Sequence, residues 1–399
     1  MNTHTGMASI QKWSELPGEL LDKIAKSLHL YPDYIRFRAV CVSWESSLPK
    51  TPNHLPRQFP LLMLPYDQEN DKPCVFFSLN ENKSYSLNFP LEFHNKFFRG
   101  ACHGWLVIVD KTPSISLFNP FTNTHIELPP LSLNSKGFEC LYKIVLSSSP
   151  NSSDFMAIAI IGDRKRFQFF GWRDRMKLAF CRYGDNRWSS LKEMPRSTGN
   201  ESSYIDVIFY KKQQIVAAKS NGLFVIMDII GGHGNSIPEI KVMQTLQPPD
   251  SVCLDHNLYL VESNDELLIV NRSVEVLSFD NCRDYDYKTT GFSVYKLDLI
   301  KNSSGSYSCK WSEMKSLGDQ MVFLGLDPSS SFSTSEFPGC KGNCIYFTDD
   351  LWDSQLEGGS SRGSDVGLFD MSEQKIKPLH CDPRELNCLP PIWITPTPL

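Results

Sequence analysis

The sequence has no apolar run long enough to cross a membrane and no strong excess of charge of either sign. A membrane helix needs about 18 or more consecutive apolar residues, and no segment approaches that length. Residues 1–12 also lack the basic and apolar stretches of a secretory signal, so we expect a soluble intracellular protein of the cytoplasm, the nucleus or both. A net charge of −5 argues against general nucleic-acid binding, which needs a basic surface.

Motifs that carry catalysis are missing as well. The sequence contains no G-x-S-x-G, H-E-x-x-H or P-loop motif, and such motifs supply the nucleophiles, zinc ligands and phosphate sites of many enzymes. Its 12 cysteines follow no pairing rhythm, and in a reducing compartment they behave mostly as small buried apolar residues. We therefore predict no disulfide, no cofactor, no bound metal and no catalysis by the chain itself.

Several local clusters nevertheless invite a chemical interpretation, and each has a simpler one. A thiolate needs a positioned base, a zinc site needs a second matching ligand pair, and a phosphate loop needs a following helix. We interpret these clusters as packed residues, flexible connections or solvated turns. They are Cys102 and His103 for a thiolate; Cys340, Cys344, His380 and Cys381 for zinc; Gly231, Gly232, His233 and Gly234 for phosphate; and Asp349, Asp350 and Asp353 with Asp280, Asp284 and Asp286 for a cation or an acid–base pair.

Helical periodicity is confined to the front of the chain. Pro17 suits the first position of a helix, and apolar residues recur at helical spacing over residues 20–28. A second start at Pro32 precedes another helical pattern over residues 37–48. So short a segment seldom buries enough surface to fold alone. We predict a helical module at 12–50 that needs a partner.

Three prolines between Thr51 and Pro60 predict a Pro-rich linker at 51–60 that connects rather than packs. After it, short β-rich runs with period-two character alternate with turn residues. Units of about four strands in radial series are typical of a β-propeller. We predict a mainly β fold with about six four-stranded blades over 61–396, seven being the alternative. The solitary strand in 390–396 lacks a hairpin partner, and the early strands are expected to supply it and close the ring.

The helical module resembles an F-box. The resemblance rests on Leu-Pro at 16–17, Glu-Leu-Leu at 19–21 and the run 38–44, with Ile35 and Phe37 where the family more often has Leu. It implies that the helices bind a Skp-type adaptor, and through it a cullin and a RING subunit, in an SCF ubiquitin ligase. Carried over by position, the adaptor interface comprises Leu16, Pro17, Leu20, Leu21, Ile24, Leu28, Val40, Cys41 and Trp44. Trp44 is the expected hot spot, because large aromatic residues dominate such interfaces.

The remainder of the chain is similar to the KIB-type β-propeller domain of plant F-box proteins. The segments that carry this similarity are 97–110, 117–131, 258–270, 316–325, 337–350 and 390–396. The resemblance implies a substrate-recognition subunit for protein ubiquitination, but it names no target, because loops on a shared fold carry specificity. Two other functions stay open: a propeller scaffold acting outside a ubiquitin ligase, and, third, a propeller enzyme.

A basic stretch between Arg164 and Arg187 has aromatic residues interleaved with its charges. Such a patch could bind an acidic or phosphorylated protein surface through charge-assisted hydrogen bonds, with Trp172, Arg173 and Arg175 as the candidate contacts. We favour the alternative, in which these charges lie on a solvated blade edge and oppose pairing with other chains. The sequence leaves open which propeller face binds a target.

Overall fold

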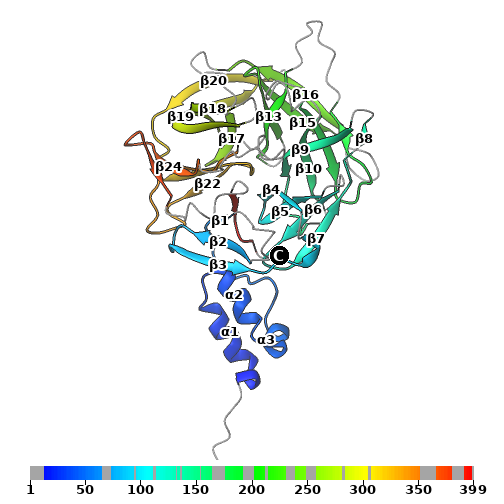
Figure 1. Ribbon diagram of the computed structural model, residues 1–399, viewed down its shortest axis with the longest axis vertical. Coiled ribbons are helices and arrows are strands. Elements are labelled where there is room, and N and C mark those ends of the chain that lie inside the picture. The colour runs from blue at the N-terminus through cyan, green and yellow to red at the C-terminus, as the bar shows by residue number, and fades with distance from the viewer. Residues whose placement is uncertain are drawn as a thin grey trace, which may run out of the picture.

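The protein consists of a small helical module and a ring of β-sheets (Figure 1). The computed structural model describes residues 13–64, 73–93, 96–110, 114–131, 133–134, 137–152, 154–163, 176–191, 202–211, 214–230, 239–248, 258–280, 284–303, 307–350, 365–379 and 391–397. Within these ranges no helix combines the length and the apolar character needed to span a bilayer.

The helical module contains a 3-10 turn, η1 (Trp13–Glu15), and three helices, α1 (Gly18–Lys26), α2 (Tyr31–Arg38) and α3 (Val42–Ser47). The first helix begins directly after Pro17, as expected. The pattern over residues 37–48 predicts one continuous helix, and this is wrong: the chain is extended at Cys41, with φ −162° and ψ 164°, and α3 starts after it. The β-branched residues Val40 and Val42 flank the break, and such residues are weak helix formers.

Six sheets of four or five strands follow, which confirms the predicted six-bladed propeller. The strands are given in order of hydrogen-bonded neighbours. Blade 1 is β26 (Ile392–Ile394), β1 (Leu61–Met63), β2 (Cys74–Ser78) and β3 (Lys83–Leu87), and blade 2 is β4 (Phe97–Cys102), β5 (Trp105–Val109), β6 (Ile115–Asn119) and β7 (Thr124–Leu128). Blade 3 is β8 (Leu133–Asn134), β9 (Gly137–Leu146), β10 (Met156–Asp163), β11 (Lys177–Arg182) and β12 (Ser189–Ser190). A further 3-10 turn, η3 (Leu91–Phe93), joins blades 1 and 2.

The second half of the ring has the same plan with longer strands in blade 5. Blade 4 is β13 (Tyr204–Tyr210), β14 (Gln214–Lys219), β15 (Phe224–Ile230) and β16 (Glu239–Leu246); blade 5 is β17 (Leu258–Ser263), β18 (Glu266–Asp280), β19 (Asp284–Lys301) and β20 (Tyr307–Met314); blade 6 is β22 (Ser330–Ser333), β21 (Gln320–Leu324), β23 (Cys344–Phe347), β24 (Gly367–Asp370) and β25 (Lys375–Pro378).

The two ends of the propeller sequence meet in blade 1. The strand β26, near the C-terminus, pairs antiparallel with β1, and Trp393 lies opposite Leu62. This confirms that the solitary C-terminal strand finds its partner among the early strands. Closure gives β1 a strand neighbour on each side, β26 and β2, and joins the two ends of the ring.

Period-two strands let every blade pack against both neighbours. In β5, Leu106 and Ile108 join the apolar cluster between blades 1 and 2, whereas Trp105 and Val107 join the cluster between blades 2 and 3. Equivalent clusters lie between each following pair of blades and between blades 6 and 1. The core is therefore a ring of six inter-blade layers.

The segment between the module and the first strand packs against the propeller, so the expectation of a freely connecting linker is wrong. The ring of Phe59 contacts Phe323 and Phe337 at centroid distances of 5.6 and 5.1 Å. The Arg57 guanidinium lies 4.1 Å above the ring of Phe332 and pairs with Glu336. The prolines stop the helix, but the aromatic and amphipathic residues after them bury surface in blade 6.

Candidate functional site

The helical module has one apolar stripe inside and another outside. On α1, Leu21 and Ala25 are buried, while Leu20 and Ile24, one position earlier in each turn, stay 45% and 39% exposed. One residue rotates a helix by about 100°, so the two pairs form adjacent stripes. Val40 and Val42, around the start of α3, are exposed at 58% and 81%. The module thus presents apolar side chains that its own core does not use.

The expected adaptor residues divide into three groups in the structure. Exposed are Pro17, Leu20, Ile24 and Val40; half-buried are Leu16, Leu28 and Cys41; buried are Leu21 and Trp44. The sequence pattern gives all nine as apolar contact residues but does not separate those that face a partner from those that face the core. Val42 and Trp13, both exposed, were missed because they lie outside the helical stripes.

Trp44 is part of the module's own core rather than an exposed anchor. Its ring lies 4.7 Å from that of Phe37, and its indole N–H donates a 3.0 Å hydrogen bond to the carbonyl oxygen of Trp13. Leu21 is fully buried beside it in the same apolar cluster. These two side chains hold the helices together, and the surface available to a partner comes from their exposed neighbours.

The α2 helix fixes the module to blades 1 and 2 (Figure 1). The ring of Tyr31 lies 6.0 Å from Phe121 of blade 2, and the Arg36 guanidinium lies 4.8 Å above the ring of Tyr85 of blade 1. Module and blades share one continuous apolar cluster. The helices are therefore held at a defined angle to the propeller.

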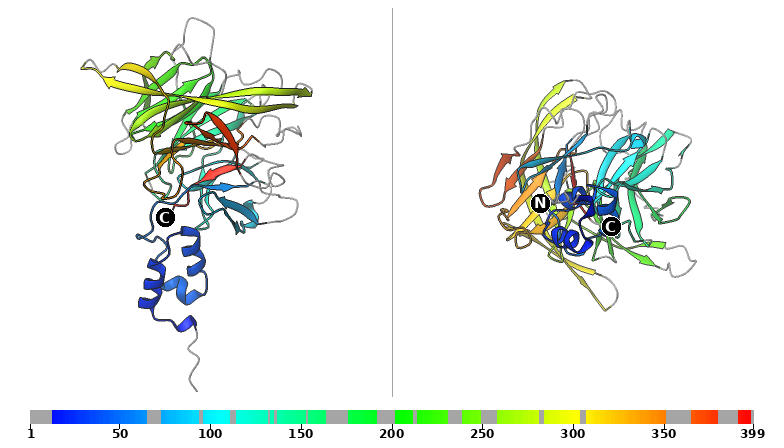
Figure 2. Two further views of the ribbon diagram at one scale, coloured as in Figure 1. Left: turned by 90° about the vertical axis from the view of Figure 1, so that its left-hand side faces the viewer. Right: turned by 90° about the horizontal axis from the view of Figure 1, so that it is seen from below.

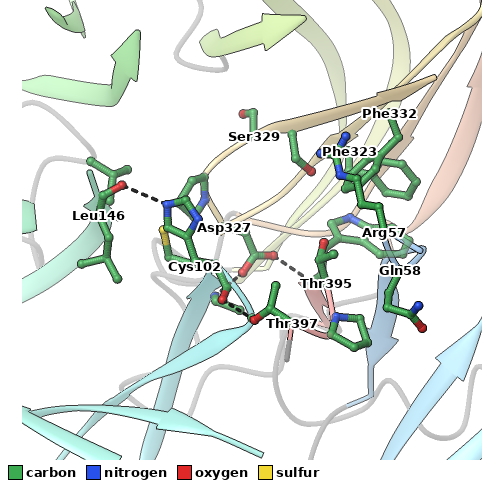
Figure 3. A pocket seen from close by; sticks show the side chains of 18 of the residues that line it. Arg57, Gln58, Cys102, Leu146, Phe323, Asp327, Ser329, Phe332, Thr395 and Thr397 are labelled. Carbon is green, nitrogen blue, oxygen red and sulfur yellow. Dashed lines mark hydrogen bonds between the residues drawn. The ribbon is translucent and has the colours of Figure 1, made fainter. Parts of the chain in front are cut away.

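A cavity of about 540 Å³ lies on the propeller axis (Figure 3). All six blades contribute to its lining, for example through Thr395, Cys102, Leu146, Phe209, Glu262 and Asp327, and the linker residues Arg57 and Gln58 border it as well. The mixture of apolar walls and polar groups is typical of a ligand pocket. Its acidic lining residues are Glu262 and Asp327.

Asp327 joins three blades at the cavity wall. One carboxylate oxygen accepts a 2.5 Å hydrogen bond from the N–H of Ala101 in blade 2, and the other accepts one of 2.7 Å from the N–H of Trp393 in blade 1. Full burial raises the pKa of this carboxyl to about 7. Because both carboxylate oxygens accept backbone hydrogen bonds from neighbouring blades, the role of Asp327 is structural.

The Cys102–His103 pair forms a strand turn instead of a nucleophilic site. His103 and Gly104 have φ values of 51° and 80°, as the turn of a tight hairpin requires, and a Cβ on Gly104 would lie 2.7 Å from the carbonyl oxygen of Thr395. Burial raises the pKa of the Cys102 thiol to about 12, so the sulfur stays protonated at neutral pH.

The acidic pair Asp349 and Asp350 is buried, so its interpretation as a solvated turn is wrong. Asp350 forms a 3.0 Å ion pair with the fully buried Arg272 of β18, and it accepts a 2.5 Å hydrogen bond from the Tyr259 hydroxyl. Asp349 accepts a hydrogen bond from the Tyr287 hydroxyl. The cluster joins blades 5 and 6, and protein groups bind both carboxylates.

Arg272 also forms a 2.8 Å ion pair with Asp365, its second carboxylate partner beside Asp350. The guanidinium Nε donates to the Thr289 hydroxyl at 2.7 Å, and the backbone N–H of Thr289 donates to Asp365 at 2.9 Å. A sequence pattern could not identify this arginine as the centre of a buried ion-pair cluster, because its acidic partners lie far along the chain.

The remaining candidates fall partly or wholly outside the described residues. These are Trp172, Arg173 and Arg175 of the basic patch, the glycine-rich residues 231–234, and His380, Cys381 and Asp353; the side chains of Asp280, Asp284 and Asp286 belong with them. Of the proposed zinc ligands, Cys344 is buried and Cys340 is half-buried. Across the described ranges, His, Cys, Asp and Glu form no group of three or more suited to a metal ion.

The chain belongs to the KIB1-4 beta-propeller family, whose model matches residues 76–370. It is similar over nearly its whole length to plant F-box proteins. F-box protein SKIP23 of Arabidopsis thaliana is 28% identical over 96% of this chain and 95% of its own length. F-box protein At2g05970 of the same plant is 25% identical, covering 92% of this chain and 91% of its own. The resemblance to plant F-box proteins with a KIB-type propeller is thereby confirmed.

Solved structures resemble the protein only weakly. The β-propeller domain of Cps50 (Swd1) from Myceliophteria thermophila has 11% sequence identity and a TM-score of 0.30, and the match covers 73% of this chain and 92% of that one. At that score the match carries no functional inference.

Proposed function

We propose that the protein is the substrate-recognition subunit of an SCF-type E3 ubiquitin ligase. Its helical module binds a Skp-type adaptor, through which a cullin and a RING subunit join, and its propeller binds a target protein. The observation that carries this proposal is the outer apolar stripe of the module, Leu20 and Ile24 with Val40 and Val42, which the described parts of the module and the propeller leave exposed. The family membership and the F-box relatives support the same assignment.

The exposed stripe contributes apolar burial to association with a partner. Full burial of one such aliphatic side chain contributes about 1.5 to 3 kcal/mol, whereas association itself costs about 4 to 15 kcal/mol. Leu20, Ile24, Val40 and Val42 are between 39% and 81% exposed, so together they offset part of that cost, and other contacts with the partner must supply the rest. One of them alone offsets less, so the stripe works as a unit.

The chain itself performs no chemistry in this proposal. A subunit that holds a target near the charged conjugating enzyme raises the effective concentration of a target lysine. That effect depends on geometry, and the packed linker together with the contacts of α2 keeps the module at a fixed angle to the propeller. A rigid joint between the adaptor surface and the target surface suits this task.

Co-purification with a Skp-type adaptor tests the proposal. The full chain should bind the adaptor, and the double variant Leu20→Asp with Ile24→Asp should lose binding, because two buried carboxylates replace two apolar contacts. The matched control is Val242→Asp, which places the same charge on an equally exposed aliphatic position, 38% exposed, in the propeller.

The outcome also separates the competing function. If the double variant still binds the adaptor as the control does, the outer stripe is not the adaptor surface. If the wild-type chain itself does not bind a Skp-type adaptor, the ligase assignment fails and a propeller scaffold outside the ligase takes its place.

A further inference from the structure

We propose that the central cavity of the propeller binds a neutral small molecule that carries an aromatic ring and a hydrogen-bonding oxygen, and that Ser329 is its polar contact. The cavity has a volume of about 540 Å³, within the range of about 300 to 1,000 Å³ that is typical of small-molecule pockets. Residues of all six blades and of the linker line it. A molecule bound there contacts the whole ring at once.

Apolar side chains line opposite sides of the cavity. Figure 3 shows Phe323 and Phe332 of blade 6 on one side and Leu146 and Cys102 on the other. The rings of Phe332 and Trp393 lie edge-on to the ring of Phe323, at centroid distances of 5.5 and 5.1 Å. Such walls suit a flat aromatic ring, because it buries a large apolar area and packs favourably against aromatic neighbours.

Ser329 supplies a polar group that the described protein leaves unused. It lines the cavity directly before β22, and Figure 3 shows it between the aromatic side and the side of Leu146. Its Oγ is buried, and no group of the described residues forms a hydrogen bond with it. A buried hydroxyl without a partner costs free energy. An oxygen of a bound molecule, placed beside this Oγ, recovers that cost.

The ionisable groups of the lining favour a neutral ligand. They are two acidic residues, Glu262 and Asp327, and two basic ones, Arg57 and His103. Both oxygens of Asp327 accept backbone hydrogen bonds, and Arg57 forms an ion pair with a residue outside the lining. The imidazole of His103 donates to a backbone carbonyl oxygen, and Glu262 also has an interaction within the protein. A charged ligand therefore loses its hydration and gains no unpaired counter-ion.

The cavity lies beside the joint between the propeller and the helical module. The linker residues Leu55, Pro56, Arg57 and Gln58 belong to its lining. Thr397 belongs to it as well, and Figure 2 marks the C-terminal end of the chain next to the helical module. A bound molecule therefore contacts the linker together with the ring. Because a ligand stabilises the folded segments that it contacts, binding should slow amide exchange in the linker.

Titration of the full chain with naphthalene probes, followed by saturation-transfer NMR, tests the inference. The probes share one ring system and differ in charge near neutral pH: 2-naphthol is neutral, 2-naphthoate is an anion and 2-naphthylmethylammonium is a cation. We expect 2-naphthol to bind about tenfold or more tightly than either charged probe, because burying an unpaired charge is costly. Amide exchange at Leu55 and Arg57 should slow when 2-naphthol is bound.

Two changes at Ser329 test the position of the probe. Ser329→Ala removes no hydrogen bond of the described protein, so the fold should persist, and 2-naphthol should bind about three- to tenfold more weakly, as expected for the loss of one neutral hydrogen bond. Ser329→Phe should fill the cavity and weaken binding more than about tenfold. The matched controls are Ser86→Ala and Ser86→Phe, since Ser86 is exposed on β3 and does not line the cavity.

Several results overturn the inference. The first is no measurable binding of 2-naphthol to the wild-type chain, and the second is binding of a charged probe that is as tight or tighter. Unchanged binding to the Ser329→Ala chain would show that Ser329 is not the polar contact. Equal binding to the Ser329→Phe and Ser86→Phe chains would place the probe elsewhere on the protein. The titration uses no ligase subunit, so its outcome is independent of whether the chain binds a Skp-type adaptor.

Discussion

The backbone N–H of Tyr31, at the start of α2, donates a 2.8 Å hydrogen bond to the side-chain Oε1 of Gln58 in the linker. The amide nitrogen of the same Gln58 donates to the carbonyl oxygens of His29 and Pro56. One buried side chain thus ties the helical module to the segment that packs on blade 6. It makes the joint between module and propeller part of the folded core.

Replacing Gln58 with Ala should loosen this joint. The change leaves the buried N–H of Tyr31 without its acceptor, which costs about 1 to 3 kcal/mol. We expect a lower unfolding midpoint in urea and faster amide hydrogen exchange at Tyr31, while exchange in β16, which does not line the cavity beside Gln58, stays as in the wild type.

The matched control for the joint is Gln374→Ala. Gln374 is exposed and makes a local hydrogen bond to the carbonyl oxygen of Met371. Removing its side chain should therefore change neither the unfolding midpoint nor the amide exchange at Tyr31 by a comparable amount. Unchanged exchange at Tyr31 in the Gln58→Ala chain would show that Gln58 does not hold the joint.

Trp44→Ala should act on stability first and on adaptor binding only as a consequence. Removing a buried Trp costs about 3 to 5 kcal/mol, and here it also removes the contact with Phe37 and the hydrogen bond to Trp13. Amide exchange in α1 to α3 should accelerate strongly. Leu20→Asp should leave that exchange unchanged, since Leu20 belongs to the exposed stripe. If Trp44→Ala left the module fully protected, Trp44 would not be a core residue.

The contrast between Leu20 and Trp44 shows which features of the adaptor surface could be predicted from the sequence and which could not. Helical spacing identifies both as members of apolar stripes, and the family resemblance places both in one interface. Leu20 on α1 is exposed, whereas Trp44 is buried and belongs to α3, which starts only after the break at Cys41. That break separates residues that a continuous helix would have aligned, and the period of the apolar residues does not reveal it.

The propeller was more accessible to prediction because its signals are local. Alternation along each strand and the turn residues between strands give the blades, and the solitary strand around Trp393 gives the closure with Leu62. Burial of Asp350 was missed because Arg272 precedes it by 78 positions. Acidic residues that have no basic residue close to them in the sequence are interpreted as solvent-exposed. Only the folded structure places the basic partner beside them.

Asp327 should make stability depend on pH. Its folded pKa of about 7 exceeds the value of about 3.9 for an Asp in an unfolded chain. The folded state therefore binds a proton that the unfolded chain has released, so the contribution of this group is greatest below about pH 4 and is lost as the pH rises to about 7. The full effect is on the order of 4 kcal/mol.

Urea unfolding at a series of pH values measures this dependence. Asp327→Asn should remove the slope that this group contributes between about pH 4 and about pH 7, even though the variant is less stable because an amide nitrogen replaces one acceptor for the N–H groups of Ala101 and Trp393. A variant with the slope of the wild type would assign the pH dependence to other groups.

Arg272→Met should be among the most destabilising single changes in the propeller. It leaves the carboxylates of Asp350 and Asp365 buried without their counter-ion, and breaking a buried ion pair in this way costs about 3 to 5 kcal/mol. Amide exchange in the part of the β18–β19 hairpin beyond Arg272 and at the start of β24 should accelerate together, because the same guanidinium holds both. The control Arg187→Met, at an exposed position, should neither destabilise the propeller to a comparable degree nor accelerate this amide exchange.

Neutralising the acidic partners should restore much of the stability lost in Arg272→Met. In the triple variant Arg272→Met, Asp350→Asn and Asp365→Asn, the buried site holds no charge, and the desolvation penalty of the two unpaired carboxylates disappears. The β18–β19 hairpin beyond Arg272 should nevertheless stay more open to exchange than in the wild type, since Thr289 no longer receives the guanidinium hydrogen bond. Recovered stability with faster exchange in this hairpin would separate the two roles of Arg272, neutralising buried acids and positioning the hairpin. Recovery of both properties would show that the hairpin does not depend on Arg272.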